Sequence, residues 1–502
     1  MNFASPLISL DGLEQLQYPT PSLTLSPNIP QEEPEPKQDF LALAPLPDDD
    51  VLKELVELFF KHFQDVVPCF HKSTLLDDIA TRKLQEESPL LLYSICAIAA
   101  QRHCDPHIKR LEQDWFQQSK FYYDLTERYP KPGLRTIQAA ICIISHSSTT
   151  GDFSAGYICL GKAWRQVCAL GLNHMDAESE HLSFDPVPEP EGPLKREECR
   201  RALWTLFILD RNHAWPTGLP PAIDEKHFMV NLPIADADFQ AMTQETSSQI
   251  EGAVLTRNFD ALVSISPNIS GNGAANALHY LCIAYILLGR AVEEIHSLHH
   301  SHDSYCYLQQ LQRIDDQLIK FRLNLPRPML HVLEAPENAR FHVTWLNCAL
   351  NAIAMLLHFR TANFASDEED ENTRFLRVVA AAKNIALLVK DVSRMDIDLL
   401  LNPHIGGLLY FATSVLLIHW RQTGDPTLRV DIDVLTLVFE RLNEQYWFLG
   451  LKYKLALEYD LQRNTESIAH LKRRGLRGLL ADCSKWKFVK ERAEGQINRA
   501  IT

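Results

Sequence analysis

The chain has 502 residues, of which 46% are hydrophobic and 23% are charged. This length exceeds what one hydrophobic core usually organises, so one large domain with extensions, or two or three smaller domains, is expected. Its 64 acidic and 49 basic residues give a formal net charge of -15. Because DNA binding relies on clustered Lys and Arg that displace counterions, this balance argues against unaided DNA binding.

Residues 1–50 differ in composition from the rest of the chain. They hold nine prolines and nine acidic residues against one basic residue, so this acidic, proline-rich segment is predicted to be disordered. In residues 39–44, acidic and apolar side chains occur together; this is typical of activation segments, although an acidic linker is the plainer interpretation. The segment begins without a basic region, so a secretory signal is not expected.

Two apolar stretches, residues 341–359 and 399–420, approach the length of a membrane span. The first carries four Asn and His residues, and the second is interrupted by Asn402-Pro403 and by two glycines. A span needs about twenty predominantly apolar residues. We therefore expect two buried core helices and no contact with a membrane.

From Val51 onward, apolar residues recur with the period of a helix. Ser88-Pro89 and Asp105-Pro106 each place a capping residue before a proline at the first helical position. Together with the apolar period, these signals predict helices near residues 51–63, 89–103, 106–128, 134–147, 154–171, 195–214, 275–300, 307–323, 340–362, 374–393, 405–421, 432–446 and 467–480.

The sequence shows no series of short alternating segments joined by hairpin turns, so the fold class is predicted to be all-α. We expect one large multi-helix domain of antiparallel helix pairs over residues 51–502. Its motif-bearing core would cover about residues 51–290, and a helical C-terminal part would cover residues 291–502. Residues 176–194, which are acidic and rich in proline, are expected to form an exposed loop.

The eleven cysteines include no pair separated by only two residues, so neither a zinc knuckle nor a thioredoxin-like motif is present. They are scattered through apolar segments, which predicts reduced, buried thiols.

Two other motifs suggest ligand chemistry without meeting its requirements. Gly156 to Lys162 fits the start of a phosphate-binding loop, but Ala163 replaces the Ser or Thr that would hold magnesium, and no strand leads into it. His296 and His300 are one helical turn apart and could share a metal with neighbouring histidines, although histidine also suits the negative end of a helix. No catalytic set is recognisable. We expect no catalytic residue, cofactor or metal site in this chain.

A basic run near the C-terminus has two interpretations. Lys472, Arg473, Arg474 and Arg477 fit a nuclear localisation signal or an anion-binding face. A solvated helix surface is the plainer alternative.

Two segments carry a pattern with fixed internal spacing, one from Gly161 to His174 and one from Glu198 to Pro233. We expect structural roles for the residues that make up this pattern. These are Gly161, Arg165, Gly171, Arg200, Arg201, Trp204, Asp210, Arg211, Gly218 and Pro220.

In order and spacing, these segments resemble the middle homology region of fungal-specific transcription factors. That family shows G-x-A-x-R-x-A-x-x-L-G-L-H, then E-x-x-R-R-x-x-W with a D-R pair, then G-R-P and a closing L-P. Residues 60–71 and 90–100 are similar to its first helices, so the resemblance covers about residues 50–290. Leu219 departs from the pattern by replacing the Arg of G-R-P. Members also carry a cysteine-rich zinc cluster ahead of this region, whereas no cysteine occurs here before Cys69.

The resemblance implies a transcriptional regulator, not an enzyme, that controls a metabolic gene set. It would work in the nucleus, with or without shuttling to the cytoplasm. Its partners would be the transcription machinery, a DNA-binding partner regulator and a small-molecule effector, and a homodimer is left open. Direct DNA binding is not expected from this chain alone, which would act through a partner or represent a truncated zinc-cluster factor. Zinc is expected only with an upstream cluster.

Two alternatives stay open at this point. One is a helical scaffold or small-molecule-binding protein that does not bind DNA. The other, which is less favoured, is an enzyme with an unrecognised site.

The spacing of charged residues in the two motif segments suggests one specific contact. Arg165 and Asp210 both lie close to apolar stripes of their predicted helices, and an unpaired buried charge is costly. One hypothesis is that the two side chains pair directly. The alternative is that each caps local backbone or reaches solvent.

Overall fold

A computed structural model of the chain separates it into two units, residues 1–42 and residues 43–502. All residues that the structure describes belong to the second, which we call the helical unit. Of the segment predicted to be disordered, residues 1–50, the first 43 lie outside the described residues. Of the loop predicted at residues 176–194, residues 178–191 also lie outside them. The described ends of this loop are packed instead of exposed, because Asp176 pairs with Arg200 and a helix begins at Pro193. Those described are 44–126, 132–177, 192–243, 252–264, 276–297, 305–361, 368–464, 466–468, 471–472, 479 and 482–501.

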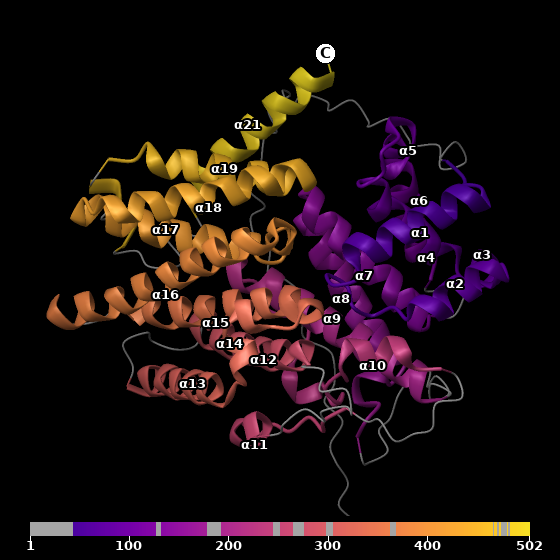
Figure 1. Cartoon of the computed structure of the whole chain (residues 1–502), viewed down its shortest axis with the longest axis horizontal. Helices are drawn as coiled ribbons and strands as arrows, with labels where there is room; N and C mark the ends of the chain where they lie inside the picture. Colours follow the sequence, from indigo (N-terminus) through magenta and orange to yellow (C-terminus); the bar gives the residue numbers. More distant parts are fainter. Residues whose placement is uncertain are drawn as a thin grey trace, which may run out of the picture. The chain divides into compact units, whose positions relative to one another are not determined.

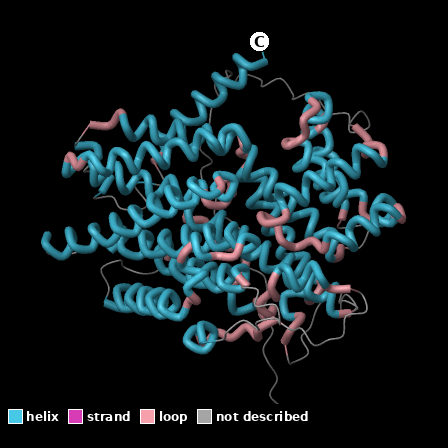
Figure 2. The backbone as a smooth tube through the Cα atoms, viewed as in Figure 1, coloured by secondary structure: helices cyan, strands magenta, loops and turns pink. Residues whose placement is uncertain are grey.

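The all-α prediction is confirmed, because the described residues form helices and connecting turns and include no strand (Figure 2). The first part of the helical unit contains α1 (Asp49–Phe63), α2 (Lys72–Ala80), α3 (Lys83–Glu87), α4 (Pro89–Ala100), α5 (Pro106–Arg110), α6 (Glu112–Leu125), α7 (Leu134–Thr150), α8 (Phe153–Ala169) and α9 (Pro193–Thr217). The second part contains α10 (Asp236–Ala241), α11 (Phe259–Ser264), α12 (Ala277–His296), α13 (Tyr305–Asn324), α14 (Arg327–Leu330), α15 (Arg340–Thr361), α16 (Glu368–Met395), α17 (Gly406–Thr423), α18 (Pro426–Gln445), α19 (Trp447–Leu461) and α21 (Cys483–Ile501).

Local capping chemistry explains where several helices begin. The Asp48 carboxylate accepts a hydrogen bond from the Val51 N–H at 3.0 Å, and the Asp105 carboxylate accepts one from the His107 N–H at 2.7 Å. Ser88 precedes the proline that begins α4 as predicted, but its side chain makes no capping hydrogen bond. There the proline alone, with its fixed φ, marks the first turn.

The folded part begins a few residues before the predicted boundary at Val51. The Trp115 indole N–H donates to the Pro45 carbonyl at 2.9 Å. Ala44 and Leu46 pack against the main core. Residues 44–50 therefore belong to the helical unit.

Helices α7, α8 and α9 lie between the N-terminal helices and the C-terminal ones (Figure 1). Helix α7 contacts α4 and α6 on one side and α19 on another, and α9 packs against α7, α8 and α12. Because α9 is covered on all sides, buried residues occur all around its circumference. This position makes α9 the central element for the sites below.

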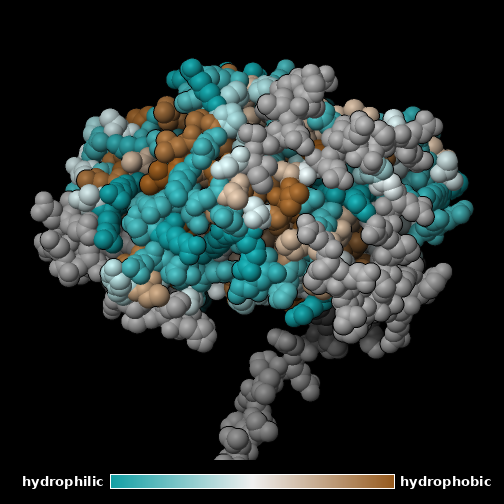
Figure 3. All heavy atoms as spheres, turned by 90° about the horizontal axis from the view of Figure 1, so that it is seen from below, coloured by the Kyte–Doolittle hydropathy of each residue, from teal (hydrophilic) through white to brown (hydrophobic). Residues whose placement is uncertain are grey.

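The two apolar stretches that approach the length of a membrane span correspond to α15 and the region of α17. Both helices contribute many fully buried side chains to the main core, as expected. Of the helices that the structure describes, none is long and apolar enough to cross a membrane. On the face drawn in Figure 3, hydrophobic side chains reach the surface as separate patches among hydrophilic ones.

Candidate functional site

The start of the second motif segment and the residue before it place four charged side chains in the first half of α9, and all four are buried. Glu197, Glu198, Arg200 and Arg201 are each at most 4% exposed. A buried charge that lacks a partner is strongly destabilising, so each of these groups requires contacts from neighbouring elements.

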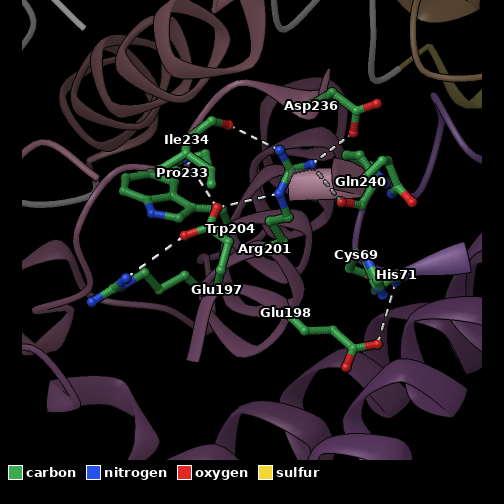
Figure 4. A network of polar contacts seen from close by, with 12 residues as sticks. Cys69, His71, Glu197, Glu198, Arg201, Trp204, Pro233, Ile234, Asp236 and Gln240 are labelled. Carbon is green, nitrogen blue, oxygen red and sulfur yellow. Dashed lines mark hydrogen bonds and ion pairs between the residues drawn. The ribbon is translucent and has the colours of Figure 1, made fainter. Parts of the chain in front are cut away.

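Arg201 uses its whole guanidinium group (Figure 4). One terminal nitrogen donates to the Pro68 carbonyl and to Asp236, both at 3.0 Å, and the other donates to the Ile234 carbonyl at 2.9 Å. Its Nε donates to Glu197 at 3.2 Å. The fork geometry of arginine suits this arrangement, because the donors lie in one plane and point in different directions. Arg201 thereby joins α9 to the turn after α1 and to the segment before α10.

Glu198 joins the same turn to α7. Its Oε1 accepts hydrogen bonds from Arg135 at 2.8 Å and from Gln138 at 3.1 Å, and it also accepts a long one from the His71 N–H at 3.5 Å. Gln138 donates in addition to the Cys69 carbonyl at 2.6 Å. The turn from Pro68 to His71 is thus held by backbone contacts to α7 and α9.

Arg200 and Trp204 fix the extended segment that ends in Leu-Pro. Arg200 makes a bidentate pair with Asp176, with N–O distances of 2.8 and 2.6 Å. Asp176 accepts the Asn231 N–H at 2.8 Å, and the Trp204 indole N–H donates to the Asn231 carbonyl at 2.9 Å. Both backbone groups of Asn231 are therefore satisfied by residues anchored to α9.

We call this set of contacts the α9 clasp. It consists of Glu197, Glu198, Arg200 and Arg201 together with the groups that they contact. Burial raises the pKa of the Glu197 carboxyl, and the two guanidinium groups oppose that effect. The clasp consists of permanent cations, carboxylates and backbone groups that connect α9 to its neighbours, and its described residues place no nucleophile next to a base.

The hypothesis of a direct Arg165–Asp210 pair is wrong. Arg165 is exposed on α8. Asp210 is 1% exposed and accepts hydrogen bonds from the N–H groups of Ala222 and Ile223 at 2.8 and 3.1 Å. Its second oxygen also pairs with Arg211 at 2.5 Å. The alternative therefore holds: Asp210 caps local backbone, and Arg165 reaches solvent.

Arg211 is buried because a glycine on α12 makes room for it. A Cβ atom added to Gly289 would lie 2.4 Å from the Arg211 Nε. The guanidinium also covers the Phe207 ring, at 4.1 Å from its centroid. The Asp-Arg pair of the motif thus lies at the contact between α9 and α12.

The glycines of the motif differ in what they do. Gly171 and Gly218 have φ values of 76° and 71°, a left-handed conformation that favours glycine at helix ends. Gly161 lies within α8 with open space where a Cβ would be, so the contacts seen here do not require glycine. Pro220 is exposed, and its carbonyl accepts a hydrogen bond from the Tyr157 hydroxyl at 3.0 Å.

A cavity of about 680 Å³ lies at the other end of α9. Its walls come from α7, α8 and α9 on one side and from α17, α19, α21 and the turn before α17 on the other. This volume is typical of small-molecule sites, which are largely apolar with a few polar groups. Six aromatic side chains line it: Phe153, Tyr157, Trp215, Tyr410, Tyr453 and Trp486.

Three basic groups face the cavity, and burial lowers the pKa of each. Burial lowers the pKa of Lys452 to about 8 and that of His404 to about 3. Burial also lowers the pKa of His213. The His213 Nδ1 lies 2.9 Å from the Leu209 carbonyl, which can only accept, so Nδ1 carries the proton. The neutral ring then presents Nε2 as an acceptor.

The metal and nucleotide motifs do not form sites among the described residues. Gly156 to Ala163 belong to the continuous helix α8. The His296 ring contacts the Trp215 carbonyl through Nε2 at 3.3 Å, whereas His299, His300 and His302 lie outside the described residues. Lys472 stacks over Phe375 at 4.4 Å, and Arg473, Arg474 and Arg477 also lie outside the described residues.

Glu54, His103 and Cys104 come close enough together to suggest a metal site. The His103 Nδ1 accepts the Asp105 N–H at 3.0 Å, so its proton is on Nε2, which faces Glu54 at 3.1 Å. This proton occupies the position that a metal would need. With Nδ1 accepting, the ring is neutral, so His103 and Glu54 form a contact between a neutral imidazole and a carboxylate.

Sequence reasoning missed several residues of these sites. It identified Arg200 and Arg201 but not their acidic partners Glu197 and Asp176, and it overlooked Lys452. The signal for Lys452 was present, since it lies within the apolar stretch WFLGLKYKLAL, where a lysine is unusual unless it has a partner.

Comparison with known proteins gives a consistent family signal. A family model described as the fungal specific transcription factor domain matches residues 56–321, just over half of the chain. An uncharacterised transcriptional regulatory protein of Schizosaccharomyces pombe is 24% identical over 386 residues, which are 74% of this chain and 36% of that protein.

Two further relatives extend this pattern. An acetamidase regulatory protein of Aspergillus fumigatus is 23% identical over 359 residues, or 70% of this chain and 40% of that protein. A Zn(2)-C6 fungal-type transcription factor of Fusarium oxysporum f. sp. lycopersici is 24% identical over 216 residues, or 42% of this chain and 23% of that protein. The chain thus spans less than half of the length of each of these relatives.

Proposed function

Because the chain belongs to the fungal specific transcription factor domain family, we propose that it is a regulator of transcription that controls a metabolic gene set. The helical unit would be its regulatory domain and would act by binding, not by catalysis. The family match over residues 56–321, which includes the α9 clasp, is the observation that carries this proposal. The name of the acetamidase regulatory protein supports a metabolic target.

We propose that DNA recognition does not come from the residues of this chain. The net charge of -15 opposes a general affinity for DNA. A DNA-binding partner regulator, or a zinc cluster present in a longer form of the protein, would supply sequence recognition. Zinc would then be bound by that cluster and not by the helical unit.

The proposal extends to location and partners. The protein would work in the nucleus and exchange with the cytoplasm, with Lys472, Arg473, Arg474 and Arg477 as the candidate import signal. Its protein partners would be the transcription machinery and a second regulator, or a second copy of this chain. A small-molecule effector would adjust its activity, and the cavity beside α9 supports this part of the proposal.

A tethering assay tests the regulatory role directly. The full chain is fused to an unrelated DNA-binding domain with known sites upstream of a reporter gene in a fungal host. We expect reporter transcription to change at least threefold relative to the DNA-binding domain alone. Deletion of the gene, followed by sequencing of transcripts, should then alter a limited set of enzyme genes.

The opposite outcomes would favour the second candidate, a scaffold or small-molecule-binding protein outside transcription. An unchanged reporter, together with unchanged transcripts and exclusion of the protein from nuclei, would contradict the proposal. The cavity supports this second candidate equally well, because a binding pocket is useful in either setting. The family membership is what places the regulator first.

A further inference from the structure

The cavity beside α9 lies where two parts of the helical unit meet. One wall belongs to the region that matches the family, through residues such as Ser148, Leu209 and His213. The opposite wall lies beyond that region and includes Tyr410, Lys452 and other residues of α17, α19 and α21. A molecule bound here would touch both parts at once.

Lys452 is distinctive in this cavity. Its Nζ lies 3.9 Å from the centroid of the Phe153 ring and 5.1 Å from that of Trp486. None of the described residues that line the cavity is an Asp or a Glu, and the described carboxylates form no ion pair with Lys452. Its side chain is half-buried, and burial lowers its pKa to about 8. The ammonium is therefore poorly solvated, and it lacks an anionic partner within the part of the chain that the structure describes.

A second buried lysine of the same region shows how this fold neutralises an ammonium that serves structure alone. Lys485 is completely buried. Its Nζ contacts the Asp460 carboxylate at 3.0 Å, the Tyr410 hydroxyl at 2.7 Å and the Leu479 carbonyl at 3.0 Å. Lys452 has no such set of acceptors among the described residues, although it lies on the same helix as Asp460.

We propose that the cavity binds a small aromatic monocarboxylate, with its carboxylate on the Lys452 ammonium and its ring among the aromatic side chains. The proposal rests on the proposed function in one respect, because it assigns the chemical class of the effector of that regulator.

The positive charge of the cavity and its aromatic lining each limit the class of ligand that it can bind. Among the described residues that line the cavity, Lys452 is the only one whose side chain is a cation at neutral pH, because burial lowers the pKa of both histidines further. One cation matches one negative charge. The surrounding aromatic rings favour a flat ring that can stack or meet them edge to face, more than a flexible chain.

The residues at the opening of the cavity support the assignment of an aromatic monocarboxylate. Leu219 and Ile158 line the cavity and are 44% and 70% exposed, which places them where it opens to solvent. Leu219 is the residue that replaces the Arg of the family pattern. Because Leu219 brings no charge to this opening, Lys452 is the described lining residue that can select for a charged ligand. Ser148 and the acceptor Nε2 of His213 could orient polar substituents of the ring.

The test compares two probes that differ only in charge. Isothermal titration calorimetry at neutral pH measures the binding of naphthylacetate and of naphthylacetamide to the purified full chain. We expect the acid to bind at least tenfold more tightly than the amide. Lys452→Met should remove this preference while leaving amide binding within about twofold, because methionine keeps the apolar contacts.

Two further variants locate the site. Lys454→Met is the matched control, since Lys454 lies on the same helix, pairs with Glu440 and does not line the cavity. It should bind both probes as the unaltered chain does. Ser154→Trp places a bulky side chain at an exposed position of the cavity wall, so folding should be preserved and both probes should bind at least fivefold more weakly.

Three results would overturn the assignment. They are equal affinity for the acid and the amide, an acid preference that survives Lys452→Met, and binding that Ser154→Trp does not weaken. Binding of a peptide of residues 39–44 with no binding of either probe would also overturn it, in favour of an occupant from the chain itself. Calorimetry uses no transcriptional readout, so its failure would leave the regulator proposal to the tethering assay.

Discussion

Arg201 provides the most direct test of how the α9 clasp holds the helical unit together. Arg201→Met removes the guanidinium and keeps most of the side-chain volume. The carbonyls of Pro68 and Ile234 then lose donors at 3.0 and 2.9 Å. Glu197 loses one of its two cationic neighbours while it stays buried. The change therefore leaves several acceptors unsatisfied without creating a large cavity.

The expected loss follows from these contacts. Leaving one buried acceptor unsatisfied costs about 1–3 kcal/mol, and removing one partner of a buried ion pair costs about 3–5 kcal/mol. Water can replace the donor to Asp236, whose side chain is 38% exposed. Because the acceptors share one donor group, their energies do not simply add. We expect Arg201→Met to lower the free energy of unfolding by about 3–5 kcal/mol.

Urea titration of the purified chain, followed by circular dichroism and tryptophan fluorescence, measures this change. Arg165→Met is the matched control: it removes another arginine of the motif, but an exposed one, so its effect should stay within about 0.5 kcal/mol. Arg201→Lys should fall between the two, because it keeps the charge and loses the fork geometry. An Arg201→Met chain that is as stable as Arg165→Met would refute the structural role of the clasp.

Further predictions concern α12, the cavity and DNA. Gly289→Ala should destabilise by about 1–3 kcal/mol because its Cβ meets Arg211, whereas Gly161→Ala, where space is open, should be neutral or stabilising in the same titration. The unfolded chain binds more protons at Lys452 between pH about 8 and about 10.4, since burial lowers the folded-state pKa to about 8. Stability should therefore rise with pH across this window, and Lys452→Met should abolish the rise and add about 2–3 kcal/mol at neutral pH. His213, His404, Tyr410 and Tyr453 also face the cavity, but burial lowers the pKa of both histidines, so they change charge below this window, and it raises the pKa of both tyrosines, which opposes a rise. A rise of equal size in Lys452→Met would therefore contradict the assignment to Lys452. In a gel-shift titration at physiological salt, the chain alone should show no sequence-selective, sub-micromolar binding to DNA.

Several helices were predictable from the sequence, including α4 and α9, in which buried residues occur on all sides but a proline marks the first turn. Helices α4, α7, α8 and α9 begin within two residues of their predicted starts. Helices α19 and α21 were missed. In α19, buried residues occur on several faces, because it packs against α7, α17, α18 and α21. Unlike α4 and α9, α19 begins without a proline, and it has no side-chain cap. Neither its period nor its start therefore marks it as a separate helix.

The partners of the motif residues were harder to predict than the residues themselves. Apolar neighbours correctly indicated that Asp210 would be buried. They could not show that the next residue, Arg211, would form an ion pair with the Asp210 carboxylate. That arrangement depends on Gly289 of α12, a residue distant in sequence. The cavity was not foreseeable for the same reason, because its lining residues run from Ser145 to Trp486.

Helix α9 connects the clasp to the cavity and thereby limits how a ligand could act. Its first half is fixed by ion pairs to α7 and α10 and by hydrogen bonds to the turn after α1 and to the segment before α10. Its second half forms part of the cavity wall through Leu209, His213 and Trp215. A bound anion cannot easily displace a helix whose charged anchors would each lose buried partners. The opposite wall carries Lys452 on α19, which has no such anchor in the clasp. We therefore expect ligand binding to draw α19 and its neighbours toward α9, so that the C-terminal helices move and the region that matches the family stays in place.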